Sequence, residues 1–84
     1  MKFYFTKHTK GKFKTLKQLG WLLTRKTIKE TIVKPDALGI GIERNAKFAL
    51  KKLDDKHDLR VIYSDSGGII VIITFYPTRR NRYG

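Results

Sequence analysis

Pro35 separates two stretches of the chain whose apolar residues recur with different periods. In residues 8–19 the apolar residues lie three positions apart, which places them along one side of a helix. In residues 38–42 they alternate with small or charged residues, which is typical of a β-strand. A helix cannot continue through proline, because the ring clashes with the preceding turn and carries no N–H. Helices followed by strands therefore predict an α+β protein.

Two helices are predicted before Pro35. The first covers residues 8–19, and Gly20 follows it as a residue that often ends helices. The second begins after Thr24, whose hydroxyl can cap a helix. The apolar positions expected to face the core are Phe13, Leu16, Leu19, Ile28, Ile32 and Val33. The residues between the helices are expected to pack beneath them: Trp21, Leu22 and Leu23.

Five strands are predicted around these helices, at residues 2–6, 38–42, 46–53, 59–63 and 68–76. The last of them is apolar on both faces, which predicts an interior strand. In the strand over residues 46–53 we expect Phe48 and Leu50 to point inward and Lys47 and Lys51 outward. The predicted order is β-α-α-β-β-β-β, with the two helices packed on a mainly antiparallel sheet in one domain of residues 1–84.

The composition narrows the functional classes. The chain has 84 residues, no cysteine and two histidines, so disulfides and thiolate metal sites are excluded and a metal or cofactor site is not expected. Its seven acidic residues show no spacing typical of a paired acid and base. The longest apolar run is the length of a strand, so we expect no membrane segment, no signal peptide and a cytoplasmic location.

A strong positive charge predicts an anionic partner. The chain carries 19 Lys and Arg residues against 7 acidic ones, a net charge of +12. One side of the first helix carries a stripe of lysines: Lys7, Lys10, Lys14 and Lys17. Such a stripe is ordinarily a solvated helix face. Because like charges at these spacings repel each other, we interpret it as a surface that contacts RNA phosphates.

Two short segments carry a resemblance to a known family. They are Thr6-Lys7-His8 after the first strand and the apolar strand that leads into Tyr76-Pro77-Thr78-Arg79-Arg80-Asn81-Arg82-Tyr83. With the element order, they make the chain similar to the RelE/ParE-like superfamily of toxin–antitoxin modules, nearest to its small uncharacterised families and the BrnT-like toxins. The resemblance implies a RelE-like fold and a toxin that cleaves mRNA, in some members on the ribosome. It also implies a small acidic antitoxin as partner.

The resemblance places catalysis at the C-terminal residues, with Arg79 or Arg80 and Tyr83 as the matching positions. Metal-independent RNA cleavage needs a proton acceptor and cationic donors to the phosphate. His8 could transfer protons, the arginines could hold a phosphate, and Tyr83 could stack on a base or donate a proton. The other residues assigned to nucleic-acid binding are Arg60, Arg82 and Tyr76.

Two alternatives stay open. One is a basic module that binds nucleic acid without cleaving it, and the other is a ParE-like inhibitor that acts on a protein such as gyrase. His57 lies in a charged turn, where a surface role is the ordinary interpretation. The oligomeric state is not predicted.

Overall fold

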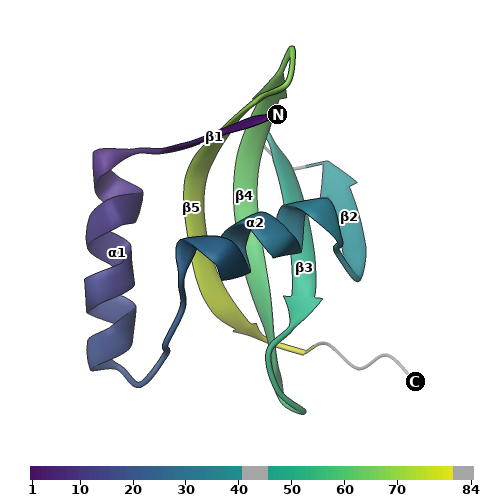
Figure 1. Ribbon diagram of the computed structural model, residues 1–84. Coiled ribbons are helices and arrows are strands. Elements are labelled where there is room, and N and C mark those ends of the chain that lie inside the picture. The colour runs from purple at the N-terminus through teal and green to yellow at the C-terminus, as the bar shows by residue number, and fades with distance from the viewer. Residues whose placement is uncertain (41–45, 81–84) are drawn as a thin grey trace.

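The computed structural model describes residues 1–40 and 46–80 of the protein. In chain order the elements are β1 (Lys2–Phe5), α1 (Lys7–Gln18), α2 (Arg25–Val33), β2 (Ala37–Ile40), β3 (Lys47–Lys52), β4 (His57–Ser66) and β5 (Ile69–Arg79) (Figure 1). The predicted α+β class and element order are confirmed. The end of the strand predicted over residues 38–42 lies outside the described residues.

The five strands form one sheet in the order β1-β5-β4-β3-β2. Strands β2 to β5 make an antiparallel meander, and β1 joins it parallel to β5, with Phe5 opposite Ile72. The helices connect β1 on one side of the sheet to β2 on the other. Figure 1 shows α2 crossing one face of the sheet and α1 standing beside β5. No helix of the described chain covers the opposite face, which we call the open face.

The core lies between α2 and the covered face of the sheet. Leu59 and Val61 of β4 are buried there, as are Ile28 and Ile32 of α2. Phe75 of β5 is also fully buried. Full burial of each such side chain contributes about 1.5–3 kcal/mol. From the flank, α1 adds Leu16 and the ring of Phe13, whose centroid lies 4.7 Å from that of Phe75.

Local signals set the ends of the helices. The backbone N–H of Thr27 donates to Oγ1 of Thr24 at 3.2 Å, which confirms Thr24 as the cap of α2. Thr6 caps α1 in the same way, so α1 begins at Lys7, one residue before the predicted start. After α1, Gly20 has a φ of 95°, a conformation that glycine adopts without steric cost.

The face of β3 was predicted wrongly. Ala49 is the fully buried residue under the helices, so Phe48 and Leu50 point to the open face, while Lys47 and Lys51 share the side of Ala49. Lys51 is accommodated there because its Nζ donates to the backbone oxygen of Lys34 at 2.9 Å, at the carboxyl end of α2. Phe48 is accommodated on the open face because Gly39 lies opposite it in β2.

Three apolar residues expected in the core are exposed. Leu19 and Leu22 are 70% and 76% exposed, because α1 stands at the flank of the sheet and ends at Gln18. Val33 is 55% exposed. It follows Ile32 by about 100° around α2, so it points sideways when Ile32 faces the sheet. Trp21 and Leu23 do pack against the core, as predicted.

The strands predicted over residues 59–63 and 68–76 are present as β4 and β5, which form a hairpin, and both are longer than predicted. Its turn is Gly67 and Gly68, which both have a positive φ, as a two-residue hairpin turn requires. At the other end β5 continues through Pro77 to Arg79. Proline is tolerated there because β1 pairs only with residues 69–72, so no strand among the described residues needs the missing N–H.

Candidate nucleic-acid interface

Three strands place an arginine between two aromatic rings on the open face. Arg60 of β4 lies directly opposite Tyr76 of β5 in the strand register. On its other side, the Cζ atom of Arg60 lies 4.3 Å from the ring centroid of Phe48 in β3. This distance is that of a cation–π contact, which holds the guanidinium against the sheet. No carboxylate of the described residues pairs with Arg60.

Helix α1 adds a fourth member to this arrangement. The Nζ atom of Lys12 lies 5.7 Å from the ring centroid of Tyr76. The open face therefore carries an alternating series, which we call the cation–aromatic row: Phe48, Arg60, Tyr76 and Lys12. Arginine fixed on a ring can bind a phosphate or stack on a base with little further loss of freedom. Among these residues, Arg60 and Tyr76 were predicted, and Phe48 and Lys12 were not.

Arg79 and Arg80 lie together in sequence but have different surroundings. Nε of Arg80 lies 3.1 Å from Oδ1 of Asp58, although its N–H is not aligned for a hydrogen bond, and both side chains are largely buried. The backbone N–H of Arg80 also donates to the oxygen of Lys56 at 2.8 Å. Arg79 is exposed and pairs with His57 across the ladder. Arg79 is therefore the more available of the two for a phosphate.

His57 also belongs to this end of the sheet. Its Nδ1 lies 3.0 Å from Oδ1 of Asp54, an atom that also accepts the backbone N–H groups of Lys56 at 2.8 Å and His57 at 2.7 Å. The Lys56 hydrogen bond, with those from His57, lowers the pKa of Asp54 below 3.8. The ring of Trp21 meets the His57 ring edge-on, with centroids 4.8 Å apart. The Asp-x-x-His spacing in the turn was the sequence signal for this contact.

The remaining predicted residues lie elsewhere or outside the described residues. His8 is exposed in the first turn of α1, which starts beside the pairing of Phe5 with Ile72. From Ile72 to Arg79 along β5 is about 23 Å, so the structure does not bring His8 to Arg79. Arg82 and Tyr83 lie outside the described residues. All four lysines of the predicted stripe are exposed: Lys7, Lys10, Lys14 and Lys17.

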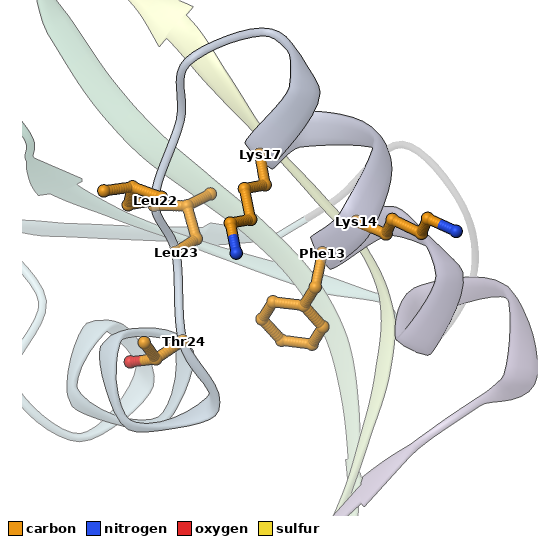
Figure 2. Close-up of a pocket in the computed structure, with 6 residues that line it drawn as sticks. All are labelled: Phe13, Lys14, Lys17, Leu22, Leu23 and Thr24. Carbon is orange, nitrogen blue, oxygen red and sulfur yellow. The ribbon is translucent and has the colours of Figure 1, made fainter.

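A groove lies between α1 and the segment that leads into α2. It has a volume of about 380 Å³ and a mostly apolar lining: Phe13, Lys14, Lys17, Leu22, Leu23 and Thr24. Figure 2 shows the ammonium of Lys17 directed toward Leu23, while that of Lys14 points away from the groove. The groove therefore joins an apolar floor to the lysine stripe, on the flank of the molecule rather than on the open face.

Other kinds of site lack support in the described residues. No three His, Asp or Glu side chains of residues 1–40 and 46–80 gather closely enough to hold a metal ion. Neither α1 nor α2, the helices of this part of the chain, has the length and apolar character needed to cross a membrane. No protein-family model, curated protein or solved structure matches the chain.

Proposed function

We propose that the protein binds single-stranded RNA across the open face of its sheet and cleaves it without a metal ion, as a toxin-type endoribonuclease. The observation that carries the proposal is the cation–aromatic row, in which the guanidinium of Arg60 lies against the Phe48 ring and Tyr76 lies opposite Arg60 in the ladder. Flat aromatic and guanidinium groups on an uncovered sheet favour unpaired bases, which can leave a stack and lie against them.

The charge of the chain supports an RNA partner. A net charge of +12 on 84 residues attracts a polyanion, and binding releases the counterions that surround it. The Arg60–Tyr76 pair lies three residues along the ladder from the His57–Arg79 pair, or about 10 Å. Because three is an odd number and strand side chains alternate, Arg79 leaves the sheet on the side of Leu59 and Val61, opposite Tyr76. An oligonucleotide bound on the open face would therefore reach Arg79 by passing around the end of the sheet.

The resemblance to RelE-like toxins supplies the finer part of the proposal. It names mRNA as the RNA, the ribosome as a place of cleavage and an acidic antitoxin as the partner that would cover the basic surface. Arg79 would then stabilise the phosphate that is attacked, because guanidinium N–H groups donate to the charge that develops there.

Binding is tested with a fluorescent RNA of about 12 nucleotides, with Arg60→Ala measured beside Lys26→Ala. Both changes remove one positive charge, but Lys26 lies on α2, which crosses the other face of the sheet. We expect Arg60→Ala to weaken binding about tenfold, as loss of a charge-assisted contact does. The slope of log K against log salt should fall by about 0.7 for Arg60→Ala and stay unchanged for Lys26→Ala. Equal effects of the two changes would contradict binding on the open face.

Cleavage is tested by inducing the wild-type protein in growing cells and following growth and the integrity of mRNA in the same cultures. Growth arrest with fragmented mRNA, reduced by Arg60→Ala, is the expected result. Intact mRNA beside salt-sensitive RNA binding would instead support the non-catalytic module. A purified protein that does not bind RNA at all would refute the proposed function.

A further inference from the structure

His57 lies at the end of the β4–β5 ladder, in an arrangement that fixes its ring. Its Nδ1 faces a carboxylate oxygen of Asp54 at 3.0 Å, and the edge of the Trp21 ring limits its rotation. We propose that His57 is the residue that accepts the 2′-hydroxyl proton when bound RNA is cleaved, an inference that rests on the proposed function. The assignment replaces His8, which lies far along the sheet from Arg79.

The first step is the direction of the hydrogen bond. The carboxylate of Asp54 receives two backbone N–H groups, from Lys56 and His57, which favour its charged form. A charged carboxylate can only accept, so Nδ1 of His57 must donate. The neutral ring then carries its lone pair on Nε2, for which the described residues offer no hydrogen-bond partner. Asp54 acts here as a positioning residue.

The second step is the neighbour across the strand. His57 and Arg79 are directly opposed in the ladder, so their side chains leave the same side of the sheet from Cα atoms about 4.5–5.5 Å apart. This is the side of Leu59 and Val61, so bound RNA must pass around the end of the sheet from the open face to reach them. Arg79 is exposed, and no carboxylate of residues 1–40 or 46–80 pairs with it. A phosphate held by Arg79 therefore lies on the same side of the sheet as the imidazole of His57, next to it in the ladder.

The charged groups around His57 agree with this role. Asp54 faces it from its own turn, and Arg79 faces it from β5. From the segment between the helices, the neighbour is the uncharged ring of Trp21. Asp58 is the next residue, but its side chain is turned to Arg80. One anion thus orients the ring and stabilises it once it is protonated, while one cation faces the substrate.

The reaction is a transfer within the RNA. Nε2 of His57 takes the proton of the 2′-hydroxyl, the O2′–P bond forms, and the P–O5′ bond breaks. The O5′ leaving group takes a proton from water, and the hydroxide that remains takes the proton from His57. The products are a 2′,3′-cyclic phosphate and a 5′-hydroxyl end, with no net consumption of water.

The competing explanation is that the Asp54–His57 contact only closes the turn between β3 and β4. His57→Asn separates the two roles, because the asparagine amide can donate to Asp54 as Nδ1 does but cannot accept a proton. We expect the variant to unfold at the wild-type temperature, bind RNA within about twofold of the wild type, and cleave it at least about a hundredfold more slowly.

The assay measures fragments of an mRNA, both free in solution and on purified ribosomes, and maps their ends. His57→Ala is measured with and without added imidazole, since an imidazole in solution can replace the missing ring. Partial recovery of the rate would support proton transfer, which a structural role does not predict. The wild-type rate should also fall in acid, because a protonated imidazole cannot accept a proton.

The outcomes separate the two proposals. Wild-type cleavage rates in His57→Asn would overturn the role of His57 and leave the endoribonuclease intact. A wild-type protein that neither binds nor cleaves RNA would overturn the proposed function and the role of His57 with it. A slow His57→Asn variant that also loses its stability, with no imidazole recovery in His57→Ala, would show that the contact is structural and would refute the inference.

Discussion

Gly39→Ala should displace the Phe48 ring and so distort the cation–aromatic row. A Cβ atom at this position would overlap the end of the Phe48 ring, so the ring must move. Gly39 lacks the positive φ found at Gly20, so an alanine there is strained by the ring and not by its own backbone. The ring is also the surface on which the guanidinium of Arg60 rests. One added methyl group therefore tests both packing and the proposed binding face.

The expected loss of stability follows from the overlap. Overpacking of this kind costs about 1–3 kcal/mol, and a domain of this size loses about 4–8 °C in Tm for each kcal/mol. Gly11→Ala is the matched control, because no atom lies within 4 Å of the added Cβ. Gly11 lies inside α1, where alanine is favoured over glycine by about 1 kcal/mol. The two Gly→Ala changes should therefore have opposite signs.

Urea unfolding of both variants measures the free energies, and RNA affinity is measured on the same preparations. Gly39→Ala should weaken RNA binding by part of the loss seen for Arg60→Ala, while Gly11→Ala should leave binding unchanged. In a Phe48→Leu background the ring is gone, so the added methyl group should cost much less. An equal cost in both backgrounds, or a Gly39→Ala protein as stable as the wild type, would refute this reasoning.

Two further predictions concern the ends of elements. Thr24→Ala should lower the free energy of unfolding by about 1 kcal/mol, because the backbone N–H of Thr27 loses the hydroxyl that caps it. Denaturant unfolding checks this, with Thr15→Ala as the control variant. Asp54→Asn should lower the free energy of unfolding only at pH values at which the Asp54 carboxyl is charged. Since the fold lowers the pKa of Asp54 from 3.8, its contribution is present above about pH 4 and is lost as the pH falls through the lower folded value. Denaturant unfolding from pH 7 to pH 2.5 should show the two proteins converge in acid, and a constant difference would contradict the assignment.

Local chemistry made the helix ends and the hairpin predictable from the sequence. Thr24, Gly20 and Gly67 act through their own backbone or the next turn of chain, so their neighbours in sequence are enough. The turn at Gly67 is two residues long, and residues 64–66, which the sequence indicated as part of it, belong to β4. The element order was predictable for the same reason, since Pro35 and the change of period are local features. The resemblance to RelE-like toxins stays a prediction about function.

The face of β3 was not predictable, because alternation alone does not say which side of a strand is covered. The larger apolar residues Phe48 and Leu50 indicated the core, yet the sheet buries Ala49 beneath α2. Which face of β3 is buried depends on contacts between residues distant in sequence. Gly39 has no side chain and so leaves space for the Phe48 ring, and the backbone oxygen of Lys34 at the carboxyl end of α2 accepts a hydrogen bond from Lys51. The cation–aromatic row was not predictable for the same reason, because its members come from four elements distant in sequence: α1, β3, β4 and β5.

The short length of β1 explains how both parts of the candidate site arise. Since β1 pairs only with residues 69–72, the edge of β5 away from β4 has no strand beside it after Ile72 among the described residues. An unpaired edge of this length would invite aggregation, and Pro77 and the flanking α1 both protect it. The position of α1 brings Lys12 to Tyr76 on the open face, and the extension past Pro77 brings Arg79 opposite His57. A longer β1 would displace α1 and separate Lys12 from Tyr76, so the cation–aromatic row depends on the short pairing of β1.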